Sequence, residues 1–283
     1  MAGTVAIGVI APHGDEAIAE ACDDATRDRA VATQRAMEEM TRRVAAADPE
    51  VAVVATPHNV HVAGYMAVLT AAQVSGRLDE APNPLELTCP VDHELAVAIH
   101  HEMNDAGVPT VAVSFGGNVP AESSAPLDWG ALIPLWHLTR TLPDLPAVVM
   151  APARDLDTNA HVRAGAAVVR AARRLGRRIA VVASADQGHG HAADGPYGFH
   201  PESAEFDARV ADIVRRNALE ELVRFDPGYA PAALADSWWQ MLMLQGALEA
   251  DGERFRAELL AYEAPTYFGM LTAVFERETD RQP

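Results

Sequence analysis

The sequence contains no lysine, since all 22 of its basic residues are arginine. Chemistry that needs an amine side chain is therefore excluded, including Schiff-base and pyridoxal-phosphate catalysis and the lysine of a phosphate-binding P-loop. Cysteine is almost absent as well: Cys22 and Cys89 form neither a CxxC pair nor a disulfide framework. This cysteine usage is what we expect of a protein in a reducing cytoplasm.

Long apolar runs are also missing, so no segment is expected to span a bilayer. The hydrophobic content of 49% over 283 residues is enough for one sizeable core, and we predict a single catalytic domain over residues 1–283. The net charge of -18 repels phosphate backbones and anionic lipids. We therefore expect no nucleic-acid partner and no membrane partner. The apolar start, residues 1–12, has no basic leader and is interpreted as a strand.

Apolar patterning along the chain predicts alternating strands and helices. Short apolar, β-branched runs predict buried strands at residues 5–10, 51–55, 109–115, 147–150 and 178–184. Apolar residues that recur every three or four positions predict helices at residues 27–47, 92–106, 161–175, 205–221, 235–248 and 253–261. This alternation predicts an α/β fold with a central, mostly buried β-sheet flanked by helices on both sides.

Histidines and a carboxylate stand where these elements end or begin. His13 and His58 follow the first two strands, His189 and His191 follow the strand near residue 180, and Asp236 precedes a helix. Loops at the ends of buried strands are where α/β folds place ligands. Two neutral imidazoles and one carboxylate suit a divalent transition metal and leave positions open for substrate and dioxygen. A further histidine beside such a metal can move protons near neutral pH.

Each of these residues also has an ordinary structural explanation when it is taken singly. A histidine after a strand and a proline is more often a satisfied loop residue than a ligand. Asp236 is a favourable N-cap residue for the helix that follows it. His189 and His191 are compatible with a solvated loop. A functional interpretation therefore depends on the residues as an ordered set.

As a set, these motifs resemble the class III extradiol ring-cleavage dioxygenases, of the protocatechuate 4,5-dioxygenase type. Residues 11–15 (APHGD) and 56–58 (TPH) are similar to the family's two histidine-ligand motifs, residues 183–199 to its acid/base segment, and residues 262–275 to its closing strand. The resemblance covers nearly the whole chain in the correct order. It implies that His13, His58 and Asp236 bind Fe(II), or Mn(II), and that His189 is the catalytic acid/base.

The reaction implied by this resemblance is the opening of a catechol-type or aminophenol-type ring by O2. An aromatic diol chelates the metal through its two oxygens, and His189 removes a proton and later returns it. Gly188 and Gly190 are expected to allow backbone geometries that other residues resist. His191 is the rival for the acid/base role and is otherwise expected to contact the substrate. Since members of the family often associate, a homo-oligomer is expected.

The sequence departs from the family at two positions. The third ligand is usually glutamate; Asp236 is the carboxylate that fits the motif, and Glu221 and Glu249 are the other candidates. Trp129 stands where many relatives have a substrate-contacting histidine. It is expected either to stack on the substrate ring or to pack within its own helix.

Two other functions remain open from the sequence alone. One is an interaction protein that resembles the Memo proteins, which share this fold. The other is a metal-dependent hydrolase on the same scaffold, which would need no oxygen.

Overall fold

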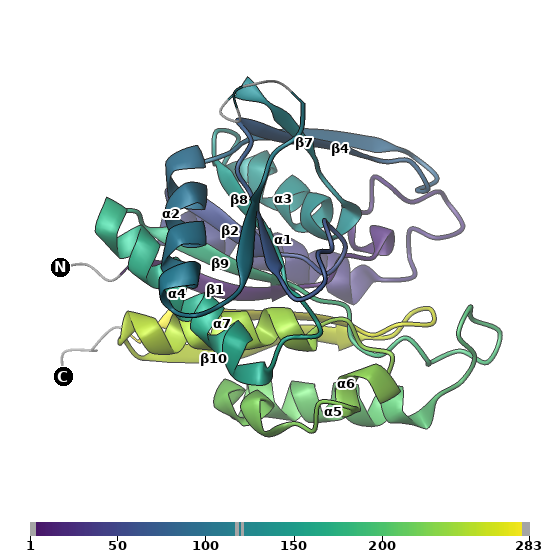
Figure 1. Cartoon of the computed structure of the whole chain (residues 1–283). Coiled ribbons are helices and arrows are strands. Elements are labelled where there is room, and N and C mark those ends of the chain that lie inside the picture. Colours follow the sequence, from purple (N-terminus) through teal and green to yellow (C-terminus); the bar gives the residue numbers. More distant parts are fainter. Residues whose placement is uncertain (1–3, 117–118, 120–121, 279–283) are drawn as a thin grey trace, which may run out of the picture.

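The computed structural model describes residues 4–116, 119 and 122–278 (Figure 1). Its central feature within these residues is an eight-stranded mixed sheet with the order β10-β11-β1-β9-β2-β8-β3-β6. In chain order the strands are β1 (Val5–Ala11), β2 (Val51–Ala55), β3 (Met66–Leu69), β6 (Thr110–Val113), β8 (Ala147–Ala151), β9 (Ile179–Ser184), β10 (Phe255–Glu263) and β11 (Met270–Arg277). A small second sheet contains β5 (Leu85–Pro90), β4 (Gln73–Leu78) and β7 (Ser124–Pro126).

Helices cover both faces of the large sheet (Figure 1). One face carries α1 (Val31–Ala47) and α3 (Trp129–Thr141), and the other carries α2 (His93–Asp105), α4 (Thr158–Leu175) and α7 (Trp238–Asp251). The helix α5 (Pro201–Arg215) packs against β10 and the short α6 (Tyr229–Ala232), and short 3-10 helices occur at η1 (Asp15–Ala17) and η3 (Leu219–Arg224). The predicted α/β class with a covered sheet is confirmed. Across the described ranges, no helix combines the length and apolar character needed to cross a membrane.

Two predicted helices are wrong in whole or in part. Residues 253–261 form most of strand β10, because antiparallel pairing with β11 overrides a helix-favouring composition. The sequence carries the signal, since Gly252 at φ +79° ends α7 just before this strand. The helix predicted over 205–221 ends at Arg215, and Asn217 at φ +55° separates it from η3. The small sheet, β3 and α3 were not predicted; Pro134 lies inside α3 and obscures its helical pattern.

The position of α7 is set by an unusually close approach to α4. A Cβ atom added at Gly165 would collide with the Met243 carbonyl, and one added at Gly246 would collide with the Val162 carbonyl. Glycine therefore lets the two backbones touch. Because α4 covers one side of α7 and the sheet covers another, α7 is buried on nearly all sides. The start of α7 is thereby held against the sheet edge.

The three central strands β1, β9 and β2 run parallel and end at the same level. Ala11 of β1 lies opposite Ser184 of β9, and Ala55 of β2 lies opposite Ala183. The loops after these strands therefore leave the sheet side by side at its carboxyl edge, the usual ligand-binding position in α/β folds.

Candidate metal centre and substrate cavity

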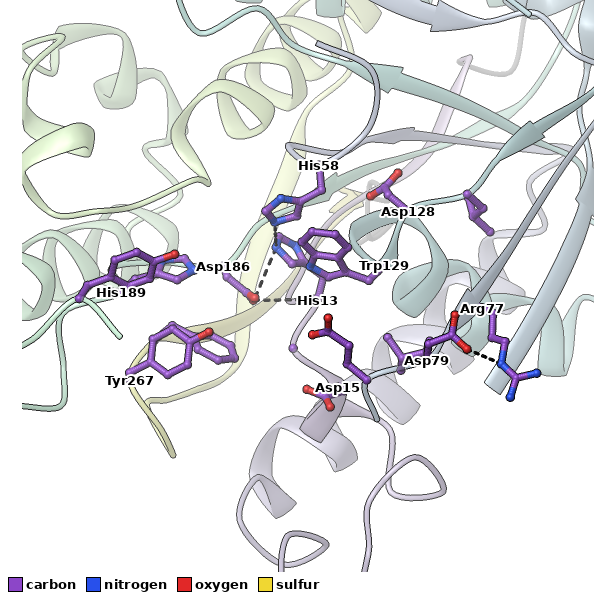
Figure 2. Close-up of a pocket in the computed structure, with 16 residues that line it drawn as sticks. His13, Asp15, His58, Arg77, Asp79, Asp128, Trp129, Asp186, His189 and Tyr267 are labelled. Atoms are coloured by element: carbon purple, nitrogen blue, oxygen red, sulfur yellow. Dashed lines mark hydrogen bonds and ion pairs between the residues drawn. The ribbon is translucent and has the colours of Figure 1, made fainter. Parts of the chain in front are cut away.

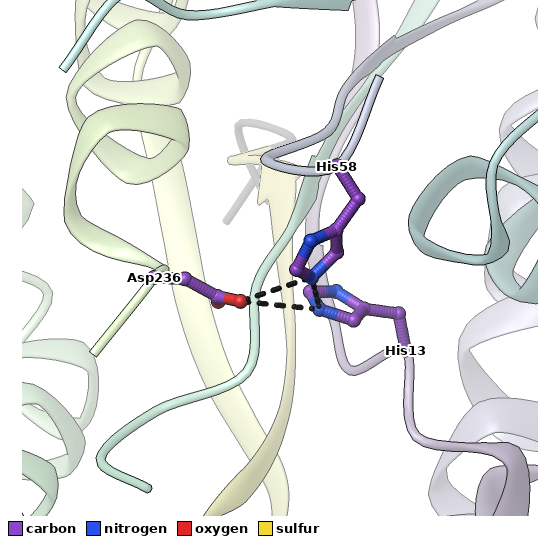
Figure 3. A group of neighbouring side chains, drawn as sticks. All are labelled: His13, His58 and Asp236. Atoms are coloured by element: carbon purple, nitrogen blue, oxygen red, sulfur yellow. Dashed lines mark hydrogen bonds and ion pairs between the residues drawn. The ribbon is translucent and has the colours of Figure 1, made fainter. Parts of the chain in front are cut away.

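The three predicted metal ligands meet at this sheet edge (Figure 3). The Nε2 atoms of His13 and His58 lie 3.0 Å apart. Asp236 Oδ2 is 3.1 Å from His58 Nε2 and 3.5 Å from His13 Nε2. His13 follows β1, His58 follows β2, and Asp236 lies just before α7, so three separate elements bring the donor atoms together.

These separations fit a first-row divalent ion. Donor atoms at about 2.1 Å from one metal, with angles near 90–110°, lie roughly 3.0–3.4 Å from one another. Asp236 Oδ1 is buried and has no hydrogen-bond partner among the described residues. The expectation that Asp236 caps its helix is also not met, because Ser237 occupies the N-cap position without a side-chain cap bond. Asp236 is therefore a buried carboxylate that does not cap the helix that follows it.

Hydrogen bonding behind His13 leaves its Nε2 atom free to coordinate. Ser184 Oγ lies 3.0 Å from His13 Nδ1 and donates its own hydrogen to the Gly130 carbonyl oxygen. The hydroxyl has one hydrogen, so it must accept from His13 Nδ1. When the ring is neutral, its Nε2 lone pair then points toward His58 and Asp236, an arrangement typical of histidine ligands.

The charge balance of the site rests on a second buried carboxylate, Asp186. It accepts a hydrogen bond from the His13 backbone at 2.9 Å and lies 3.4 Å from His13 Nε2. Burial lowers the pKa of His13, but Asp186 and Asp236 outweigh it and raise that pKa from 6.5 to about 9. Burial alone would raise the pKa of Asp236, yet the charge on His13 and bonds from both imidazoles hold it well below its ordinary value. A negative site of this kind attracts a cation.

Asp186 was not assigned a role from the sequence, although it stands among the polar residues after β9. Its position next to the Gly-His segment was the available signal. For Asp186 itself, burial raises the pKa, and the neighbouring charge of His13 opposes this shift.

The loop that carries His58 is tied to the start of α3. Thr56 Oγ1 donates to Asp128 Oδ1 at 2.6 Å, and Asn59 Nδ2 donates to Asp128 Oδ2 at 2.7 Å. Asp128 also caps α3 by accepting from the Ala131 backbone at 3.1 Å. One carboxylate thus fixes both flanks of His58 against a rigid helix.

A cavity of about 510 Å³ opens beside the two histidines (Figure 2). Aromatic side chains form much of its wall: Trp129, Tyr197, Tyr267 and Phe268. Trp129 is 48% exposed, and its ring stacks on His58 with a centroid distance of 4.2 Å and an interplanar angle of 25°. Its ring is therefore placed at the cavity, and the structure does not bury it within its own helix.

His189 faces the same cavity from the opposite side and lies about parallel to Phe268 at 5.5 Å. Its Nδ1 atom is buried without a hydrogen-bond partner in the described chain. Since Nδ1 is enclosed, Nε2 is the ring nitrogen that a ligand can reach. His189 thus lies outside the cluster of His13, His58 and Asp236, but it lines the same cavity as His13 and His58.

The glycines beside His189 serve a purpose other than the expected one. Neither Gly188 nor Gly190 has a positive φ. A Cβ at Gly188 would instead lie 2.5 Å from Ser203 Cβ, and a Cβ at Gly190 would lie 2.5 Å from His200 Cβ. The glycines therefore allow the loop to pack directly against the start of α5.

The remaining candidate residues lie elsewhere. His191 is bonded to Asp207 through its Nε2 atom at 2.8 Å and is not among the residues that line the cavity. Its expected substrate contact thus has no geometric support. Glu221 is paired with Arg216 on the surface, and Glu249 is exposed. Neither glutamate joins the two histidines.

A second cavity of about 430 Å³ borders the metal cluster on its other side. His58, His189 and Tyr197 line both cavities, and Asp236 lines the second. Leu234, which also lines it, has φ +53°, a strained conformation for a branched side chain. This backbone turn leads directly into Asp236, and strain of this kind occurs where a functional group must be held in place.

Comparisons with known proteins identify the family of this chain. The family model described as the catalytic LigB subunit of aromatic ring-opening dioxygenase matches residues 10–275. Protein CA_C1420 of Clostridium acetobutylicum is 25% identical over 248 residues, which are 87% of this chain and 52% of that protein. This chain therefore spans about half the length of that relative.

Among the solved structures with a similar fold, one example covers nearly the whole chain. It is that of the uncharacterized protein JW3007 from Escherichia coli K12, with a TM-score of 0.61, 15% identity and coverage of 95% of this chain and 98% of that chain. At this identity the similarity concerns the fold alone.

Proposed function

This chain belongs to the family of catalytic LigB subunits of aromatic ring-opening dioxygenases, and on that premise we propose that it performs extradiol cleavage of a catechol-type or aminophenol-type ring. The observation that carries the proposal is the meeting of two imidazole Nε2 atoms and one carboxylate oxygen beside an aromatic-lined cavity. A two-histidine, one-carboxylate set with open positions is typical of non-haem Fe(II) oxygenases. Mn(II) suits the same donors.

His13, His58 and Asp236 would hold the ion, and Asp186 and Ser184 would orient His13. When bound, the metal supplies redox coupling between substrate and dioxygen and lowers the pKa of the coordinated hydroxyl. The protein orients the substrate and transfers protons to and from it.

The cavity walls orient an aromatic substrate. Trp129 and Tyr267 offer ring surfaces, and such rings stack favourably on an aromatic ligand. His189 Nε2 accepts the substrate hydroxyl proton and returns it as the ring opens, because it is the reachable nitrogen of an uncoordinated histidine beside the site. Phe268, which stacks on His189, forms an apolar wall beside the imidazole.

Oxygen uptake by the Fe(II)-loaded protein tests this proposal on a panel of catechols and aminophenols. The expected result is consumption of one O2 per ring opened, with a yellow ring-opened product seen by absorbance. Asp236→Ala should lose both bound iron and oxygen uptake. Glu249 is an exposed carboxylate in α7, the helix that follows Asp236, so Glu249→Ala is the matched control and should keep both. Product formation without oxygen would favour the hydrolase, and no turnover across the panel would favour an interaction protein.

A further inference from the structure

We propose that Asp207 is a positioning residue that holds His189 in the orientation required for proton transfer. This inference depends on the proposed role of His189, but the contacts that support it are different from those of the metal cluster. Asp207 lies in α5, is fully buried, and does not touch the metal cluster or line either cavity. It also assigns a role to His191, whose ring does not reach the substrate cavity.

The carboxylate of Asp207 binds the chain on both sides of His189. Its Oδ1 atom accepts a hydrogen bond from the Gly188 backbone at 2.7 Å. Its Oδ2 atom accepts from His191 Nε2 at 2.8 Å. The residue immediately before His189 and the second residue after it are thereby bonded to the same carboxylate.

Two further groups lie against the Asp207 carboxylate. Tyr262 of β10 donates its hydroxyl to Oδ2 at 2.8 Å. Burial and the neighbouring Asp207 charge raise the pKa of Tyr262, so the phenol remains a donor. The Gly269 backbone lies so close to Oδ2 that any side chain there would displace the carboxylate.

The arrangement matters because, among the described residues, no hydrogen bond fixes the His189 ring. Its Nδ1 atom is unpartnered in the part of the chain that the structure describes, and the ring contacts of His189 are with Tyr197, Tyr267 and Phe268. The orientation of the imidazole therefore depends on the backbone that carries it. A displacement of about 1 Å in a reacting group costs on the order of 10²-fold in rate, so a loosened loop is costly. A buried carboxylate with three donors is a strong anchor, since charge-assisted hydrogen bonds are the stronger ones.

The test compares Asp207→Asn with the matched control Tyr262→Phe. Asparagine retains an acceptor for Gly188 but presents an amide hydrogen to His191, whereas Tyr262→Phe leaves both bonds to the loop intact. Asp207→Asn should retain iron and anaerobic substrate affinity within about 2-fold while kcat falls roughly 10- to 100-fold. Tyr262→Phe should stay within about 3-fold of the parent kcat. His191→Ala removes the bond from His191 to Asp207 and leaves the buried carboxylate in place, so it should also lower kcat. This variant replaces Asp207→Asn in the test if Asp207→Asn fails to fold.

A measurement on the metal-free protein keeps this test independent of the proposed reaction. In ¹⁵N-histidine spectra, the His189 ring should give one sharp set of signals in the parent and in Tyr262→Phe, and exchange-broadened signals in Asp207→Asn and His191→Ala. A second readout is a double-mutant cycle. In a His189→Phe background, Asp207→Asn should change kcat by less than about 2-fold, because the group it positions is gone. Unchanged His189 signals, or an equal loss of kcat in both backgrounds, would overturn the proposal. Absence of all turnover with broadened signals would instead count against the proposed reaction and support the positioning role.

Discussion

Lowering the pH should weaken metal binding through His13, because the proton and the metal ion compete for the same Nε2 atom. The carboxylates of Asp186 and Asp236 raise the pKa of His13 to about 9. At pH 7 the metal-free ring is then protonated in about 99% of molecules, which reduces the apparent metal affinity by roughly 100-fold, or about 2.7 kcal/mol. Metal binding should accordingly release a proton.

The assay is competition with a chelator of known affinity, using Zn(II) as a redox-inert probe, from pH 6 to pH 9. The contribution of His13 predicts that apparent affinity rises about 10-fold for each pH unit across this range and levels off above pH 9. Calorimetry in buffers of different ionisation enthalpy should detect the released proton.

A variant tests whether the neighbouring carboxylate causes the effect. Asp186→Asn removes the largest contribution that raises the pKa of His13, so the affinity should level off at a lower pH. The exposed Glu249→Gln should behave as the parent. An affinity that does not depend on pH, or an unchanged midpoint in Asp186→Asn, would refute the reasoning.

The same pKa shift predicts a trend in the stability of the metal-free protein. Because the pKa of His13 is raised on folding, its stabilising contribution is fully present below pH 6.5 and is lost as the pH rises through about 9. Denaturant titration at pH 6 and pH 9 should show this loss in the parent, and a smaller loss in Asp186→Asn.

Three further substitutions have distinct expected outcomes. His189→Phe should retain iron and substrate affinity while turnover falls about 10²–10⁴-fold; loss of iron on elemental analysis would make His189 a ligand. Trp129→Ala should alter the ratio of kcat/KM between substrates without changing iron content, because the ring is half exposed at the cavity; an equal loss on every substrate together with a lower Tm would contradict this. Gly246→Ala should lower Tm through the collision with the Val162 carbonyl, whereas Gly107→Ala, in open space, should show only the backbone cost of its positive φ.

Much of the frame could be predicted from the sequence because its physical signals are local. The apolar runs at residues 51–55 and 147–150 contain enough β-branched residues, and are short enough, to be buried strands, and β2 and β8 lie there. The motif order also pointed to His13 and His58, because each follows a strand whose end is marked by proline. Residues 253–261 were wrongly predicted as a helix, because the edge strand β10 is stabilised by its partner β11 and not by its own composition.

The site required tertiary structure because its contacts join residues far apart in the chain. The sequence offered Asp236, Glu221 and Glu249 as carboxylates, and of these three the fold brings Asp236 to the histidines, just before helix α7, which packs closely against α4. In the sequence alone, Asp186 and Asp207 look like ordinary polar residues. Their importance comes from burial, where a carboxylate must find donors and charges among its neighbours. Asp186 bonds to His13, which is 173 positions away in the sequence. Asp207 bonds to Gly188, His191 and Tyr262.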